Sequence, residues 1–285
     1  MTIVWRSLYV LLVVGVGLLA GVGRAEAQGI LDTKHNLSPV AGTGANRTPT
    51  GQTIYLTAMK QTDGTTDTAE VCVFCHTPHG ADTAVKAPLW NRAVSNTSSY
   101  TMYSSPTMDS VPDQANMGVS LACLSCHDGT IAFDALRNLP GPGGYDSAPV
   151  AGGRNPTGWT WNGGVKQMPA TGITNIGTDL SNDHPIAMIY DAARSPSSTS
   201  QDETTGFTTA TLTGTRVYVE RSVSVPGASA IAAKVPLFSP TGTVADARVQ
   251  CATCHDPHST LNPTFLRVDN AKSSALCRTC HKKDA

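Results

Sequence analysis

The chain reads Cys72-Val73-Phe74-Cys75-His76, and it repeats this Cys-x-x-Cys-His pattern three more times. The other copies are Cys123-Leu124-Ser125-Cys126-His127, Cys251-Ala252-Thr253-Cys254-His255 and Cys277-Arg278-Thr279-Cys280-His281, so all eight cysteines of the 285 residues are used. Two cysteines at this spacing lie about one helical turn apart, so both sulfurs can reach one edge of a porphyrin. The pattern is the attachment signature of c-type haem, in which the adjacent histidine ligates the iron.

Zinc and disulfides are the alternative uses of these cysteines. A zinc site needs its ligands to converge on one tetrahedral ion, which Cys75 and His76 do poorly because they are sequence neighbours. Disulfides would leave the four following histidines unexplained. We therefore predict four covalent c-type haems, at sites 1 to 4 in the order of the motifs. The proximal iron ligands are then His76, His127, His255 and His281.

The four other histidines of the chain match the number of irons. They are His35, His79, His184 and His258. If each serves one iron, every axial position is closed, which favours electron transfer over an enzyme that binds substrate at iron. The alternative is that a methionine takes an iron, and the candidates are Met59, Met102, Met108, Met117, Met168 and Met188.

Residues 1–27 are predicted to be a secretory signal peptide. Arg6 supplies the positive charge, an apolar run follows at residues 8–22, and Ala25-Glu26-Ala27 provides a cleavage site. No other stretch has the length and apolar character of a membrane span. We therefore expect an exported protein at the cell surface or outside the cell, with the periplasm as the alternative.

The composition offers little side-chain material for a conventional core. Charged residues make up 14% and aromatic residues 6% of the chain, which has 26 glycines and 18 prolines. A net charge of −1 gives no electrostatic case for binding nucleic acid or anionic lipid. The predicted fold class is a multihaem cytochrome c that is mostly irregular coil, with short helices at the motifs, a small β-hairpin and the haems as the core.

The order of the motifs indicates an internal duplication. Residues 72–79 and 251–258 share the form CxxCHxPH, whereas sites 2 and 4 lack the second histidine. A lone histidine, His35 or His184, precedes each pair of motifs. This plan predicts an N-terminal dihaem module at residues 28–140, a linker at 141–179 and a C-terminal dihaem module at 180–285.

Local spacing suggests which haem His79 and His258 serve. Each lies three residues past a proximal histidine, too near to reach the opposite face of the same porphyrin. The preceding prolines, Pro78 and Pro257, fix the turn that directs each histidine outward. His79 is therefore assigned to site 2 and His258 to site 4. His35 and His184 remain for the first site of each module, in an order that the spacing leaves open.

Regular structure is expected to be sparse. Short helices are predicted at residues 120–128 and 273–282. Residues 207–212 and 216–225 alternate in polarity on either side of Thr213-Gly214 and predict a β-hairpin within 207–225. This hairpin carries no histidine or cysteine. It is interpreted as an insertion in the C-terminal module or, alternatively, as a contact surface for a partner.

Several segments together resemble the multihaem c-type cytochromes of metal-reducing bacteria. They are KHNLS at residues 34–38, CVFCHTPHG at 72–80, CLSCHDG at 123–129, DHPI at 183–186 and CATCHDPHS at 251–259. The chain resembles in particular the OmcE-type tetrahaem cytochromes, which polymerise into extracellular filaments. The resemblance does not extend to residues 141–177 or to the predicted hairpin.

The resemblance implies a homopolymer with a continuous stack of bis-histidine haems. It also implies that His35 ligates site 3 of the neighbouring subunit and that His184 serves site 1. Redox proteins or extracellular acceptors would be the partners. Three functions are therefore considered: an extracellular filament that conducts electrons, a monomeric periplasmic electron shuttle with all ligands in cis, and a multihaem reductase. The reductase is the weakest because it needs an open iron, so we expect no enzyme activity.

Overall fold

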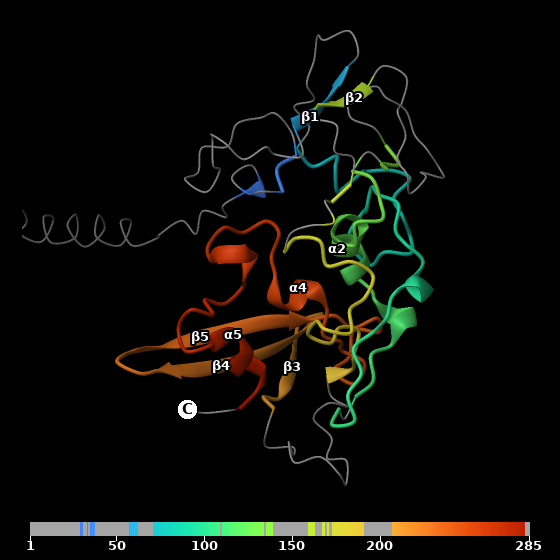
Figure 1. The fold of residues 1–285 in the computed structure, drawn as a ribbon. Helices are drawn as coiled ribbons and strands as arrows, with labels where there is room; N and C mark the ends of the chain where they lie inside the picture. The colour runs from blue at the N-terminus through green and yellow to red at the C-terminus, as the bar shows by residue number, and fades with distance from the viewer. Residues whose placement is uncertain are drawn as a thin grey trace, which may run out of the picture.

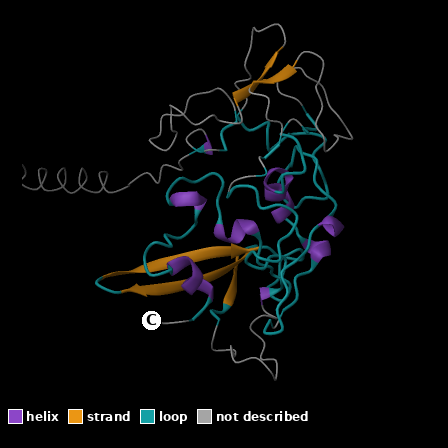
Figure 2. Ribbon diagram, in the orientation of Figure 1, coloured by secondary structure: helices purple, strands orange, loops and turns teal. Residues whose placement is uncertain are grey.

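Loops make up most of the described chain, and the regular elements are short (Figure 2). The structure is a computed structural model. It describes residues 29–30, 33, 35–37, 71–108, 110–133, 135–138, 167–168, 170, 173–190 and 207–282, and the backbone of 57–61 and 159–162. The predicted signal peptide and most of the predicted linker lie outside these residues. No helix in the described part of the chain is long and apolar enough to cross a membrane.

Three short helices carry three of the four motifs. They are α2 (Ser120–His127), α4 (Cys251–Cys254) and α5 (Ala275–Cys280), and three 3₁₀ turns lie at Thr97–Ser99, Gln114–Asn116 and Pro263–Phe265. The helices predicted at residues 120–128 and 273–282 are thereby confirmed, the second with shorter bounds. Site 1 forms a single turn instead, closed by a hydrogen bond from the His76 amide to the Cys72 carbonyl (2.8 Å).

A three-stranded antiparallel sheet lies in the C-terminal half (Figure 1). Strand β3 (Ala210–Thr213) pairs with β4 (Arg216–Val225), which confirms the predicted hairpin, and β4 pairs with β5 (Ala228–Leu237). The third strand was not predicted. It follows a two-residue turn at Pro226-Gly227, in which proline fixes the first position and Gly227 takes the positive φ (72°) of the second.

A second, smaller sheet joins distant parts of the chain. Strand β1 (Thr57–Gln61) pairs antiparallel with β2 (Trp159–Asn162), and Met59 lies opposite Trp161. Sequence analysis predicted no regular structure for either segment. The pairing places part of the predicted linker beside the N-terminal segment (Figure 1).

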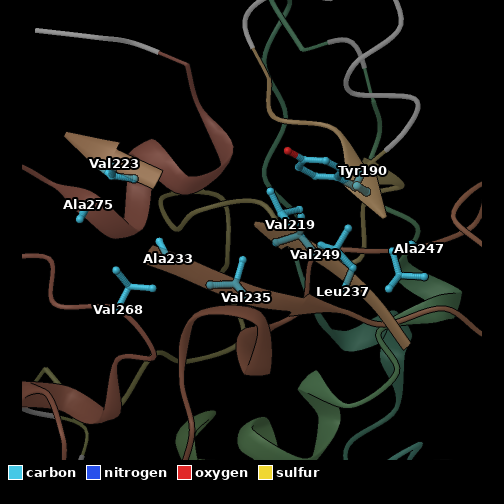
Figure 3. Packing of buried hydrophobic residues seen from close by; sticks show 12 residues of the cluster. Tyr190, Val219, Val223, Ala233, Val235, Leu237, Ala247, Val249, Val268 and Ala275 are labelled. Carbon is cyan, nitrogen blue, oxygen red and sulfur yellow. The ribbon is translucent and has the colours of Figure 1, made fainter. Parts of the chain in front are cut away.

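The larger sheet has an apolar core made by polypeptide alone (Figure 3). Alternate residues of β4 and β5, including Val219 (0% exposed) and Val235 (1%), point to one face of the sheet. The rest of the cluster comes from other elements and includes Tyr190, Ala247, Val249, Val268 and Ala275. The expectation that haems replace a conventional core therefore does not hold for this region. That expectation was based on the low aromatic content. Small β-branched residues on a twisted sheet, however, pack densely without aromatic rings.

The two predicted modules are in direct contact. Ser120, at the start of α2, is fully buried and donates a hydrogen bond to Gln250 Oε1 (2.5 Å), just before α4. The Cys251 amide donates to Ser120 Oγ (3.0 Å). Close by, Arg248 forms an ion pair with Asp113 (3.2 Å). These contacts hold sites 2 and 3 against each other, although about 130 residues separate them in the chain.

Candidate haem attachment sites

Each motif presents its two cysteines and its histidine from one turn of chain. The histidine amide donates to the carbonyl of the first cysteine, at 2.8 Å in site 1, 3.1 Å in site 3 and 2.9 Å in site 4. In site 2 the motif forms the C-terminal part of α2. All eight cysteines are thiols without a disulfide partner, so the disulfide alternative has no support. This is the arrangement that two thioether bonds to one porphyrin require.

The proximal histidines are held by backbone carbonyls. Nδ1 of His76 donates to the Pro88 carbonyl (2.6 Å), Nδ1 of His127 to that of Thr174 (2.6 Å) and Nδ1 of His255 to that of Thr264 (2.8 Å). A proton held on Nδ1 leaves Nε2 with a free lone pair, and such second-shell bonds orient the imidazoles that bind metals. The residues present therefore fit c-type haem at these three sites.

The two CxxCHxPH segments share a pattern of backbone hydrogen bonds. At site 1 the Thr77 amide donates to the Leu89 carbonyl (2.9 Å) and the Asn91 amide to the Cys75 carbonyl (2.9 Å). Site 3 repeats both bonds, from Asp256 to Phe265 (2.7 Å) and from Arg267 to Cys254 (2.9 Å). Each CxxCHxPH segment is thus followed by a returning loop that supplies the carbonyl for its proximal histidine.

Both returning loops contain strained backbone at the equivalent place. Leu89 (φ 52°) follows the Pro88 carbonyl, and Phe265 (φ 62°) follows the Thr264 carbonyl. Left-handed conformations are unfavourable for such side chains and persist where the surrounding structure enforces them. In both loops the left-handed residue directly follows the carbonyl that accepts the hydrogen bond of the proximal histidine.

Cysteines of successive motifs lie close enough to affect one another's pKa. Burial raises the pKa of Cys75 to about 12, and the nearby Cys126 adds to this. The Cys123 thiol donates a hydrogen bond to Cys251, which raises the pKa of Cys123 and lowers that of Cys251. The cysteines of sites 1, 2 and 3 therefore lie within electrostatic range of one another.

The same relation continues from site 3 to site 4. Burial raises the pKa of Cys280 to about 12, and the nearby Cys254 contributes. The three-stranded sheet supports site 4, because Arg221 of β4 donates to the His281 carbonyl (3.1 Å) and to that of Arg278 (2.9 Å). The predicted hairpin is thus part of the framework of site 4. Whether it also contacts a partner stays untested.

His35 and His258 each face a proximal histidine of another segment. The His258 and His76 rings are nearly parallel (17°) with centroids 6.3 Å apart. The His35 and His127 rings are perpendicular (88°) with centroids 6.1 Å apart. His35 also stacks on Phe265 (4.5 Å), and burial, followed by the neighbouring His127, lowers the pKa of His35 to about 4. It is therefore neutral at pH 7, as a metal ligand must be.

His79 and His184 are both exposed on the surface. Among the described residues, neither ring faces another histidine. The hydrogen bond from Cys123 lowers the pKa of Cys251, and the negative charge of Asp183 partly offsets this, so Asp183 lies near site 3. His184 follows Asp183 in the chain and therefore lies in the same neighbourhood.

The structure differs from the sequence-based assignment of the distal histidines. His79 was assigned to site 2, but the ring that faces the site 2 histidine is that of His35. His258 was assigned to site 4, but it faces His76 of site 1. Local spacing excluded the adjacent haem but gave no information on which distant site the returning loop would approach. The donation of His35 to a neighbouring subunit stays a prediction.

Three of the candidate methionines, Met102, Met117 and Met188, pack in apolar clusters. Met117 is fully buried with Trp90 and Leu124, and Met102 packs against the same cluster. Met188 packs against the core of the large sheet.

The parts of the site that sequence analysis missed are backbone carbonyls, which carry no residue signature. The Thr174 carbonyl, together with the bond from the Ile176 amide to His127 O (2.7 Å), also gives the end of the predicted linker a role at site 2.

Comparison with known families supports the haem assignment for the C-terminal part of the chain. The family model described as the doubled CXXCH motif matches residues 243–285, which contain sites 3 and 4. No curated protein matches the chain. The match and the motifs indicate a multihaem c-type cytochrome with covalently bound haem, and such haem attachment is consistent with an exported protein.

Proposed function

We propose that the protein carries four covalent c-type haems and transfers electrons along them in the order of sites 1, 2, 3 and 4. The observation that carries this proposal is the packing of site 2 against site 3 through Ser120, which bonds to Gln250 and to the Cys251 amide. Cysteines of successive motifs also lie close enough to affect one another's pKa, from Cys75 and Cys126 through Cys123 and Cys251 to Cys254 and Cys280. Porphyrins attached to neighbouring cysteines are held at close range. Electron transfer is favoured over catalysis because four distal histidines are available to close every iron.

The intact mass and the spectrum of the native protein test this proposal. We expect four covalent haem additions that survive acid–acetone extraction, and low-spin irons throughout the oxidised protein. Fewer than four additions would overturn the haem count. A high-spin iron in the native protein would instead favour the reductase alternative, because a substrate could then bind there.

The proposal includes assembly into an extracellular filament that carries electrons to external acceptors. The support is the resemblance of the haem-bearing segments and of residues 34–38 to the filament-forming cytochromes. A monomeric periplasmic shuttle is the second candidate, and the contacts of the His35 ring with His127 and Phe265 of the same chain are compatible with it. Negative-stain microscopy of the native protein, with size-exclusion chromatography, distinguishes the two, because only the first gives filaments.

A further inference from the structure

We infer that two of the haem sites are completed in cis by histidines from distant segments: His258 is the distal ligand of site 1, and His35 is the distal ligand of site 2. This inference rests on the proposed haem binding and specifies the ligand sets that it uses. Its basis is the pair of ring arrangements at His76 and His127.

The spacing of the rings equals the span of a bis-histidine iron. Two metal–nitrogen bonds of about 2.0 Å and two imidazole ring radii of about 1.1 Å give a centroid separation of about 6.2 Å. The observed separations are 6.3 Å for His76 and His258 and 6.1 Å for His35 and His127.

Ring orientation supports the same ligand sets. Nδ1 of His76 and Nδ1 of His127 each donate a hydrogen bond to a backbone carbonyl (2.6 Å in both), which leaves Nε2 as the nitrogen that can bind a metal. In His258, Nδ1 lies 3.5 Å from Asp256 Oδ1, and Asp256 is itself fixed by Arg267 (3.0 Å). Because Nδ1 is engaged in each of His76, His127 and His258, Nε2 is the atom of each ring that is available to an iron between the paired rings.

The polypeptide around the two pairs holds them in place. Thr33, Asn36 and Leu37 beside His35 are buried within the chain, so His35 is part of the packed structure. His258 is positioned by the returning loop of site 3, whose Phe265 contacts His35. One loop of the C-terminal half therefore supports the distal ligands of both N-terminal sites.

Carbon monoxide titration of the reduced protein tests the assignment of His258. The native protein should bind none, and His258→Ala should bind one equivalent. In a background without site 1, made by Cys72→Ala and Cys75→Ala, the His258→Ala change should add no further binding. His184→Ala is the matched control, because it should add one equivalent in both backgrounds. One added equivalent from His258→Ala in the background without site 1 would overturn the assignment.

Electron paramagnetic resonance of the oxidised protein tests both assignments without removing a haem. Near-parallel axial imidazoles give a rhombic low-spin signal, whereas perpendicular ones give a signal with one very large g value. His258→Ala should therefore remove a rhombic component, and His35→Ala a large-g component. The reverse pattern, or an unchanged spectrum, would contradict the ligand sets.

The monomer of the native protein tests whether His35 acts in cis. A dilute monomer isolated by size exclusion should have only low-spin irons if His35 belongs to its own chain. One open iron in that monomer, closed again on assembly, would show donation from a neighbouring subunit. The number of haems is measured by mass for the native protein and for every variant. Fewer than four haems in the native protein would contradict the proposed function. Four haems with other ligand sets would contradict only this inference.

Discussion

Replacing Ser120 by alanine should destabilise the joint between sites 2 and 3, by which we mean the hydrogen bonds that connect Ser120 of α2 to Gln250 and Cys251. The Ser120 hydroxyl is fully buried, donates to Gln250 Oε1 (2.5 Å) and accepts from the Cys251 amide (3.0 Å). Gln250 is 2% exposed, so water cannot easily replace the lost partner. Both hydrogen bonds use the same atom, Ser120 Oγ. The substitution therefore removes both links between the start of α2 and the start of α4 at once.

The magnitude follows from the two groups that lose a partner. A buried donor or acceptor without its hydrogen bond costs about 1–3 kcal/mol, so the loss of both bonds should lower the free energy of unfolding by about 2–6 kcal/mol. Ser125→Ala is the matched control on the same helix. Its hydroxyl is equally buried but donates within α2, to the Ala122 carbonyl (2.7 Å), so its loss should cost about 1 kcal/mol.

Guanidinium unfolding of the haem-loaded protein, followed by far-ultraviolet circular dichroism, measures both variants. The mass of each variant should still show the native haem content, so that a change in stability does not reflect incomplete attachment. Equal costs for Ser120→Ala and Ser125→Ala would refute the reasoning, because the joint between the halves would then contribute nothing beyond a local bond.

Three further changes test the fold around the sites by the same unfolding measurement. Val235→Ala should cost about 2–3 kcal/mol, since it removes two methyl groups from a side chain that is 1% exposed; a cost under about 1 kcal/mol would show a poorly packed core. Gly129→Ala should cost about 1–3 kcal/mol, because Gly129 has φ +71° and a new Cβ would lie 2.5 Å from Asn175 Nδ2; native stability would contradict this close approach. Glu220→Gln should change stability by less than about 1 kcal/mol, because its ion pair with Lys234 (2.6 Å) is nearly half exposed on both sides; a larger loss would reveal a role beyond that pair.

Sequence reasoning located the features that a short pattern determines. The Cys-x-x-Cys-His spacing requires one tight turn of chain, and all four motifs form such a turn or helix. Alternation of polarity likewise located β3 and β4. Strand β5 was missed although Val225-Pro226-Gly227-Ala228 is a turn signal and Ala233, Val235 and Leu237 alternate toward the core. The signal was present there, but it came after a strand already assigned as the end of a hairpin.

The choice of distal ligand could not be obtained from spacing. Geometry along the chain excludes His258 from site 3, but it does not distinguish site 4 from site 1, which is 182 positions away from His258. That choice depends on the packing of the two halves, through contacts such as Arg248 with Asp113 and Gln250 with the Asn116 carbonyl (3.1 Å). Long-range contacts of this kind leave no local periodicity in the sequence.

The duplication and the proposed ligand sets together suggest why the two halves interlock. Two independent dihaem modules would each need four axial histidines of their own, and the sequence provides such a set in each half. In the structure, however, the CxxCHxPH segment of site 3 supplies the His258 ring that faces His76, and the loop that follows it supplies the Phe265 side chain that stacks on His35. Closing sites 1 and 2 therefore requires the C-terminal half to be folded against the N-terminal half. The same contact places Cys123 beside Cys251. Ligation of the first two irons and close approach of sites 2 and 3 thus depend on one packing event, which joins the two pairs of haems into a single series.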